Sequence, residues 1–454
     1  VEFEIVPNFR ALGPKLGKQM PLCKAALEQA DGSALYALLE ETVTAHPDSS
    51  GGAMVVLDIP TREVLALVSY PSYDPNRFGE LYPTLVEDTR ATPLRFRAVA
   101  GRYAPGSTVK PLICLAGLLS GTIDLGFHDR CTGYLFDDQR DRWRCWSIHG
   151  TGRRKAHGDV DIVAALTGSC NVFMYRLGER IGIDRLCSTL DMVGIGRLAG
   201  TGLNEEVRGI NPTPGWLMAR KNMRPTPGTA RLYAIGQGEV AMTPVQVANL
   251  MATYASGQFR YVTLIRGGPQ RPTWTIPATA AQWSANRRGI YGVVNDADGT
   301  AHKYAFYKSD RVALCGKTGS ATAGSWPTAY DVSYTDDDGV RQTVRVPAGA
   351  RREAIDRFRA SHPYVPRDSV TAQVARRWPP HDPPPGERFS HAWFAGFLQP
   401  LGGDGQPDWS HAPRTAFAVL VEFGGSGGRT TGPLARRIAA ELEAFETGTS
   451  DTGL

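Results

Sequence analysis

The sequence has no apolar run long enough to cross a membrane. Its longest nearly uninterrupted apolar stretch, residues 112–119, is far shorter than the roughly 20 residues that span a bilayer. The chain opens at Val1 without an initiator Met, a basic n-region or an apolar h-region. We therefore expect any targeting segment or membrane anchor to lie outside this sequence.

Long runs of one charge sign are also missing. The 50 basic and 45 acidic residues give a net charge of +5 and are spread along the chain. A nucleic-acid-binding surface normally shows as a concentration of Lys and Arg, so no nucleic-acid partner is predicted. Lysine is scarce, with nine among the 50 basic residues. The seven cysteines include no CxxC pair, and an odd number cannot all pair within one chain. Cysteine usage therefore does not decide whether the protein works in an oxidising or a reducing compartment.

The 454 residues, 42% of them hydrophobic, are enough for a large core. Two apolar runs around the turn-like string IPTRE predict an antiparallel hairpin over residues 52–70. Periodicity and capping residues predict further helices over 107–119, 159–166, 171–181, 243–254 and 433–445, and strands over 311–322, 391–398 and 415–423. Strands that come before and after the helices favour an α+β fold over a parallel βαβ sheet.

Ser107 and Lys110 form an SxxK string at the start of a predicted helix. Residues three positions apart face the same side of a helix, so the hydroxyl and the amine lie within reach of each other. A serine needs a base to act as a nucleophile at neutral pH, and a desolvated lysine can be that base. Alone, the string is also typical of an N-cap serine and a solvated lysine.

Two further strings carry suitable chemistry. Ser169 and Asn171, in the turn between two predicted helices, offer a hydroxyl to relay a proton and a carboxamide to hold a substrate amide. Lys317, Thr318 and Ser320 lie on a predicted strand, where they can bind a carboxylate. Gly319, between them, lets a substrate backbone approach closely. Each string is unremarkable alone, but SxxK, SxN and KTG in this order form a specific combination.

With these motifs the chain resembles the transpeptidase domain of class B penicillin-binding proteins. Within that family the segments CWSIHG, HGDVDIVAAL and SCNVFMYRLGERIGIDRL are most similar to the elongation-type enzyme of the rod-shape machinery. The resemblance implies a fold like that of penicillin-binding proteins and serine β-lactamases, with an antiparallel five-stranded sheet and helices on both faces. It also implies one transpeptidase domain over 41–447 with an insertion at about 323–390, an N-terminal appendage of unexplained origin over 1–40 and a flexible tail over 448–454.

The family's chemistry implies roles for the matching residues. Ser107 would be the acyl-accepting nucleophile and Lys110 its base, with the backbone N–H groups of Ser107 and Ser320 as the oxyanion hole. Ser169 and Asn171 would relay protons and position the peptide, and the KTG residues would bind the terminal carboxylate. The reaction would crosslink peptidoglycan stem peptides ending in D-Ala-D-Ala, and β-lactams would acylate the same serine. A membrane glycosyltransferase of the elongation machinery would be the partner, on the extracytoplasmic or periplasmic side of the inner membrane.

Other functions stay open at this point. A D,D-carboxypeptidase or a serine β-lactamase would pass the acyl group to water, and Glu205 and Glu206 lie where a class A β-lactamase has its water-activating glutamate. The surrounding string TGLNEEVRG, however, also resembles the transpeptidase's own loop. A β-lactam-binding sensor is a third possibility.

One group of residues suggests a metal. The reaction itself requires no cofactor, but potential ligands gather in sequence around the SxN motif: Asp129, Cys131, Cys145, His149, His157 and Cys170. Sulfur and imidazole ligands suit zinc, so a zinc site near Asp129, Cys145, His157 and Cys170 is one hypothesis. Unpaired loop residues are the simpler interpretation, and a disulfide between Cys131 and Cys145 is another.

Overall fold

The computed structural model describes residues 32–46, 49–88, 90–140, 142–148, 155–268, 271–323, 329–336, 339–347, 351–366, 369–374 and 390–448. The chain forms two compact units. The larger comprises the described parts of Val1–Ala45, Ser49–Thr322 and Ser390–Leu454, and the smaller those of His46–Asp48 and Ala323–Phe389. Most of the predicted N-terminal appendage, the predicted tail beyond Gly448, and His149 lie outside the described residues.

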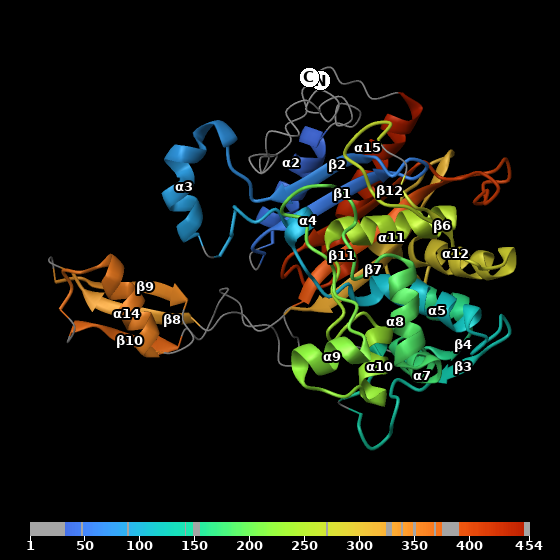
Figure 1. Ribbon diagram of the computed structural model, residues 1–454, viewed down its shortest axis with the longest axis horizontal. Coiled ribbons are helices and arrows are strands. Elements are labelled where there is room, and N and C mark those ends of the chain that lie inside the picture. The colour runs from blue at the N-terminus through green and yellow to red at the C-terminus, as the bar shows by residue number, and fades with distance from the viewer. Residues whose placement is uncertain are drawn as a thin grey trace. The chain divides into compact units, whose positions relative to one another are not determined.

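A five-stranded antiparallel sheet forms the centre of the larger unit (Figure 1). Its strands, in spatial order, are β2 (Val64–Tyr70), β1 (Gly52–Asp58), β12 (Thr415–Val421), β11 (Ser390–Pro400) and β7 (Val312–Thr322). The runs are rich in β-branched and aromatic residues, and the middle strands are buried on both faces. The predicted hairpin and the three later strands are confirmed, as is the α+β class.

Helices cover both faces of this sheet. Alternate residues of β1 point to opposite sides, so Val55 packs with the helix α11 (Pro244–Ser256), while Met54 packs with α2 (Gly32–Thr44) and α15 (Gly432–Thr447). Figure 1 shows α2 and α15 on one side of the sheet and α11 on the other. Helix α2 spans the expected domain boundary at residue 40 and adds its leucines to the core.

A second group of helices makes up much of the rest of the larger unit. It consists of α4 (Arg97–Ala100), α5 (Lys110–Leu119), α6 (Ile162–Thr167), α7 (Asn171–Ile181), α8 (Ile183–Met192), α9 (Pro214–Lys221), α10 (Pro227–Ala234), α12 (Ala280–Asn295) and α13 (His302–Ala305). Capping boxes at threonines begin α10 and α12 of this group, at Thr226 and Thr279, and also α11, at Thr243. Short pieces complete the unit: α3 (Phe78–Glu87), β3 (Asp129–Cys131), β4 (Gly158–Val160), β5 (Gln258–Phe259) and β6 (Trp274–Thr275).

Two predicted helix starts differ from the structure. Asp159 lies in strand β4, opposite Arg130, and α6 begins only after Asp161, whose carboxylate accepts the backbone N–H of Ala164 at 2.7 Å. Asp161 is therefore the N-cap, the position that Asp favours. Ser107 belongs to a 3-10 turn, Gly106–Val109, and the α-helix proper begins at Lys110.

The smaller unit has a core of its own. Three antiparallel strands, in the order β10 (Thr371–Val374), β8 (Ala329–Thr335) and β9 (Arg341–Pro347), pack against helix α14 (Arg351–Ser361). Phe358 of α14 and Val332 of β8 are almost fully buried in this core. The stretch expected as an insertion in the sequence thus folds into a small sheet with one helix.

Candidate active site

Ser107 lies in the 3-10 turn that leads into α5, and it is half-buried. Gly106 precedes it with a φ of +56°, a conformation that glycine adopts without strain, and its N–H donates to the Gly236 carbonyl at 2.9 Å. Residue 236 must also be glycine, because a Cβ there would lie 2.1 Å from the Gly106 backbone oxygen. Two glycines therefore hold the serine's loop against the segment after α10.

Lys110, one turn after Ser107, is fully buried and connects two of the three motifs. Its Nζ donates to the Ser169 carbonyl at 2.7 Å, to the Ser169 Oγ at 3.1 Å and to the Asn171 Oδ1 at 2.7 Å. Burial lowers the pKa of Lys110 to about 8, because the charged form loses its hydration. The structure thus joins SxxK and SxN through a lysine whose pKa is lowered toward neutral pH.

Trp146, in the 3-10 turn Trp146–Ile148, hydrogen-bonds to the backbone of the SxN turn. The Trp146 indole N–H donates to the Gly168 carbonyl at 2.9 Å and to the Ser169 carbonyl at 3.1 Å. Ser169 has a φ of +52°, which is uncommon for a residue with a side chain and marks a conformation imposed by its surroundings. Cys170 caps α7, and Asn171 begins it.

The KTG motif lies on β7, at the edge of the sheet. Lys317 is fully buried, and burial together with the nearby charge of Lys110 keeps its pKa well below the ordinary lysine value. Gly319 faces the serine's loop, because a Cβ there would lie 3.0 Å from the Pro105 oxygen and from Thr108 Cγ2. The strand and the loop that carries Ser107 are therefore in direct contact.

The two hydroxyls beside Gly319 each have a partner. Thr318 Oγ1 lies 3.0 Å from the Thr300 Oγ1, and Ser320 Oγ accepts the backbone N–H of Gly427 at 3.1 Å. The predicted site residues thus come together in the structure from the 3-10 turn before α5, the first residue of α5, the α6–α7 turn and β7. The sequence analysis gave no site role to Trp146, Thr300 or Gly427. Trp146 lies in the string CWSIHG, which carries part of the family resemblance, whereas the partners of Thr300 and Gly427 come from distant segments.

A cluster of sulfur and imidazole groups lies directly behind the SxN turn. Cys131, Cys145, His157 and Cys170 place their ligand atoms within 4.8 Å of one another. The His157 Nδ1 is 3.3 Å from the Cys145 sulfur and 3.7 Å from the Cys131 sulfur, and the backbone N–H of Asn171 donates to the Cys145 sulfur at 3.3 Å. The cluster is thus joined to the SxN motif by Cys170 and Asn171.

The structure corrects two expectations about this cluster. Asp129 is not a member, because its carboxylate accepts the Arg176 guanidinium at 2.6 Å, and Cys131 takes the fourth place. Cys131 and Cys145 form no disulfide, and all six cysteines of the described residues are free thiols.

Electrostatics favours a charged pair within the cluster. Burial opposes the charge of His157, but its hydrogen bonds to Cys131 and Cys145 outweigh burial and raise its pKa to about 9. Hydrogen bonds with Cys131 and Cys170, and after them the contact with His157, lower the pKa of Cys145, so its thiolate is favoured beside the imidazolium.

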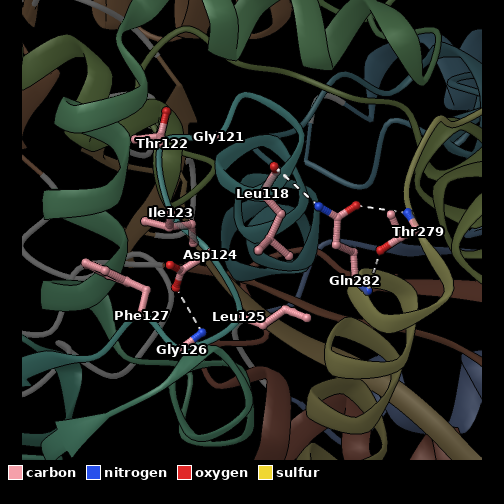
Figure 2. A pocket seen from close by; sticks show the side chains of 10 residues that line it. All are labelled: Leu118, Gly121, Thr122, Ile123, Asp124, Leu125, Gly126, Phe127, Thr279 and Gln282. Carbon is pink, nitrogen blue, oxygen red and sulfur yellow. Dashed lines mark hydrogen bonds between the residues drawn. The ribbon is translucent and has the colours of Figure 1, made fainter.

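A separate concavity lies at the other end of α5. Figure 2 shows it between the loop that follows Leu118 and the start of α12, where Gln282 donates to the Leu118 carbonyl at 3.4 Å and Asp124 accepts the Gly126 N–H at 2.9 Å. Eight residues at about 1.5 Å of rise each place Leu118 roughly 12 Å along the helix from Lys110. None of the motif residues lines this concavity.

A family model supports the motif assignment. The model of the penicillin binding protein transpeptidase domain matches residues 52–338, which include all three motifs and more than half of the chain. The chain therefore belongs to the penicillin-binding protein transpeptidase family.

The chain is similar to the peptidoglycan D,D-transpeptidase MrdA of Haemophilus influenzae. The two are 34% identical over 405 residues, which is 85% of this chain and 52% of that protein. The chain therefore spans about half the length of this curated relative.

Solved structures share the fold. A penicillin-binding protein (PBP2) from Helicobacter pylori, solved in complex with MreC, has a TM-score of 0.66 and 24% identity, over 92% of this chain and 63% of that one. A chain of a peptidoglycan synthase complex, whose title describes the coordination of polymerization and crosslinking, has a TM-score of 0.65 and 25% identity, over 94% of this chain and 62% of that one. Among the described residues no helix is long and apolar enough to cross a membrane.

Proposed function

We propose that this chain is a serine-type peptidoglycan D,D-transpeptidase that crosslinks stem peptides through an acyl-enzyme on Ser107. The observation that carries the proposal is the position of Lys110, whose buried amine is one turn from Ser107 and bonded to both Ser169 and Asn171. Membership of the transpeptidase family and the similarity to MrdA support the same reaction.

In the first half-reaction Lys110 accepts the proton of Ser107, and the Ser107 Oγ attacks the carbonyl carbon between the two terminal D-Ala residues. The backbone N–H groups of Ser107 and Ser320 stabilise the oxyanion that forms. The C–N bond then breaks, the leaving D-Ala takes a proton relayed through Ser169, and the donor peptide stays on Ser107 as an ester.

In the second half-reaction the amine of another stem peptide attacks this ester. A base at the Lys110 and Ser169 pair removes the amine's proton, the new amide bond forms, and Ser107 recovers its hydrogen. A β-lactam follows only the first half-reaction, because its amine remains attached to the opened ring. No step of this sequence requires a cofactor.

Substrate binding falls to the remaining motif residues. We assign Asn171 to the peptide amide of the donor, and Lys317, Thr318 and Ser320 to its terminal carboxylate. Gly319 leaves room for the extended donor peptide beside β7, as in recognition by strand addition.

Labelling with a fluorescent penicillin tests the nucleophile. Ser107→Ala should abolish the covalent label in folded protein, because no other group forms the ester. Ser188→Ala, at an exposed serine of α8 whose hydroxyl bonds only within its helix, is the matched control and should label fully. Retained labelling of Ser107→Ala would overturn the assignment.

Product analysis separates the transpeptidase from the alternatives. With lipid-linked substrate we expect crosslinked dimers, whereas a D,D-carboxypeptidase would release D-Ala without dimers and a sensor would do neither. A β-lactamase would also lose its penicillin adduct within seconds. The structure gives Glu206 another role, since its carboxylate accepts the Gly200 N–H at 2.8 Å and the Thr201 hydroxyl at 2.7 Å.

For the partner and the place of action, we propose a membrane glycosyltransferase and the extracytoplasmic side of the inner membrane. The support is the fold shared with a chain of a peptidoglycan synthase complex, together with the location of the substrate outside that membrane. Faster crosslinking when an elongation glycosyltransferase supplies nascent strands, relative to a catalytically dead glycosyltransferase, would support this pairing.

We also propose that Cys131, Cys145, His157 and Cys170 bind a structural zinc ion. Three sulfurs and one imidazole nitrogen within 4.8 Å suit tetrahedral zinc. The ion would fix Cys170 and hence the turn that carries Ser169 and Asn171. Metal analysis should find about one zinc per chain, lost in Cys131→Ser but kept in Cys187→Ser, which removes a thiol outside the cluster. A content below about 0.2 per chain would refute the site.

A further inference from the structure

Thr300 lies in the segment between α12 and α13, outside every sequence motif, yet it touches two of the catalytic segments. Its hydroxyl is 3.0 Å from the Thr318 hydroxyl on β7. Its backbone N–H donates to the Thr167 carbonyl at 3.3 Å, two residues before Ser169. Thr300 therefore connects the KTG strand with the end of α6.

The backbone around Thr300 is held in place. The Gly299 N–H donates to the Asp296 carbonyl at 2.9 Å, and the Ala301 N–H to the Val293 carbonyl at 2.9 Å. A Cβ on Gly299 would lie 2.3 Å from the Gly292 oxygen, so only glycine fits there. A Cβ on Gly428 would lie 2.9 Å from the Thr300 oxygen, which shows that the glycine-rich loop after β12 packs against Thr300.

Hydrogen-bond direction decides what the strand hydroxyls offer a substrate. A hydroxyl has one hydrogen to donate and two lone pairs that accept. Ser320 accepts the Gly427 N–H, so its own hydrogen is free to point at a ligand. Thr318 reaches the same state only if Thr300 donates to it, because a Thr318 that donated to Thr300 would have no hydrogen left for a carboxylate.

We infer that Thr300 is a positioning residue that donates to Thr318 and so turns the Thr318 hydroxyl toward the carboxylate of the substrate. The inference rests on the proposed function of this site. A hydrogen bond from a hydroxyl to an ion is stronger when that hydroxyl itself accepts one, because the chain of bonds polarises the O–H group. Thr300 would therefore raise the reactivity of carboxylate-bearing donors specifically.

The test compares a β-lactam acid with its neutral ester. The second-order rate constant of Ser107 acylation is measured with benzylpenicillin and with its methyl ester, for the wild type, Thr300→Val and Thr300→Ser. Valine keeps the shape but cannot donate to Thr318, so we expect the rate with the acid to fall about fivefold, the loss typical for one neutral hydrogen bond of about 1 kcal/mol. The rate with the ester should change less than twofold, and serine should restore the wild-type ratio.

A control separates positioning from loosening of the fold. Thr42→Val removes a hydroxyl on α2 that bonds the Leu38 carbonyl at 2.8 Å, and it should leave both rates unchanged. If Thr300→Val lowers the melting temperature, the two rates are measured for Thr300→Ala instead. Equal losses with acid and ester, or no loss with either, would overturn the inference. A wild type that benzylpenicillin does not acylate on Ser107 would instead refute the proposed function.

Discussion

Two lysines, Lys110 and Lys317, are fully buried among the described residues, and both belong to the candidate site. Burial removes hydration from an ammonium group and favours the neutral amine. With a pKa of about 8, roughly a tenth of Lys110 is neutral at pH 7, against less than a thousandth for a lysine at its ordinary value. Its position in the core therefore supplies the neutral fraction that the proposed role of Lys110 as base requires.

The pH dependence of acylation follows from this shift. Because the neutral amine is the active form, the acylation rate constant should rise about tenfold per pH unit below pH 7 and level off above about pH 8.5. Stopped-flow measurements with a chromogenic β-lactam, with circular dichroism as a control for folding at each pH, would show the curve. A flat profile between pH 6 and 9, or a midpoint above pH 9.5, would contradict the role of Lys110.

Glu422 is the centre of a buried polar cluster at the end of β12. Its carboxylate accepts the Arg97 Nε at 3.0 Å, the Tyr103 hydroxyl at 2.7 Å and the Ser50 hydroxyl at 2.7 Å. Burial opposes its ionisation, but Arg97 and the two hydroxyls outweigh burial and lower the pKa of Glu422. Its contribution to stability is therefore present above the unfolded pKa of about 4.3 and is lost as the pH falls through the lower folded value.

Glu422→Gln should lower the free energy of unfolding by about 3 kcal/mol at pH 7, because it leaves the buried Arg97 without a counter-charge. Urea titrations at pH 7 and below pH 4 would measure this, and the difference should shrink at the lower pH. Glu206→Gln is the matched control, a buried glutamate that accepts two neutral hydrogen bonds, and should cost about 1 kcal/mol. Equal losses in the two variants would argue against the ion pair.

At the scale of elements, the nucleophile loop depends on backbone contacts between short segments. The loop before α5 touches the segment after α10 at Gly236, where φ is +67° and a Cβ would meet the Gly106 oxygen at 2.1 Å. The two segments are in direct backbone contact in space. A side chain at Gly236 could therefore fit only if the loop that carries Ser107 moved.

Gly236→Ala should therefore displace Ser107 and slow penicillin acylation more than tenfold. Gly238→Ala is the control. It has a similar φ of +74°, but a Cβ there would meet only side-chain atoms, of Tyr233 at 3.3 Å and of Leu232 at 3.4 Å. The control should cost about 1 kcal/mol of stability for the strained φ and leave acylation within about twofold. Similar acylation rates in the two variants would show that the Gly106 contact does not position the serine.

At the scale of the whole molecule, the chain leaves the central sheet to form the smaller unit and returns to the sheet at one point. Thr322, at the end of β7, is paired with Ser390, at the start of β11. Two antiparallel strands whose ends are paired can be joined by a two-residue turn. The smaller unit also buries a hydrophobic core of its own.

Replacing residues 323–389 with Asn-Gly should therefore leave a folded protein that reacts with penicillin within about threefold of the wild-type rate. A thermal melt and a labelling time course would measure both properties. A variant with the same two residues inserted after Gly403, in an exposed turn beyond β11, is the control for a local change. Failure to fold or to label would show that the smaller unit is required for the site.

Much of the fold could be predicted from local sequence. Short apolar, β-rich runs predicted the hairpin and the three later strands, and periodicity with capping residues predicted α7, α11 and α15 to within three residues. The three motif strings also predicted the segments that meet at the site. These properties follow from residues close together in the chain, where steric and capping preferences act.

The sequence by itself determined which residue types carry the chemistry and in what order, because spacing and local periodicity are properties of the chain. Only the tertiary structure decided that Lys110 is buried, that Cys131 and not Asp129 joins the thiol cluster, and that Thr300 lies against Thr318. Burial and hydrogen-bond partners come from segments far apart in the sequence. The physical reason is that desolvation and short-range contacts depend on the packed neighbours of a group, which no local pattern specifies.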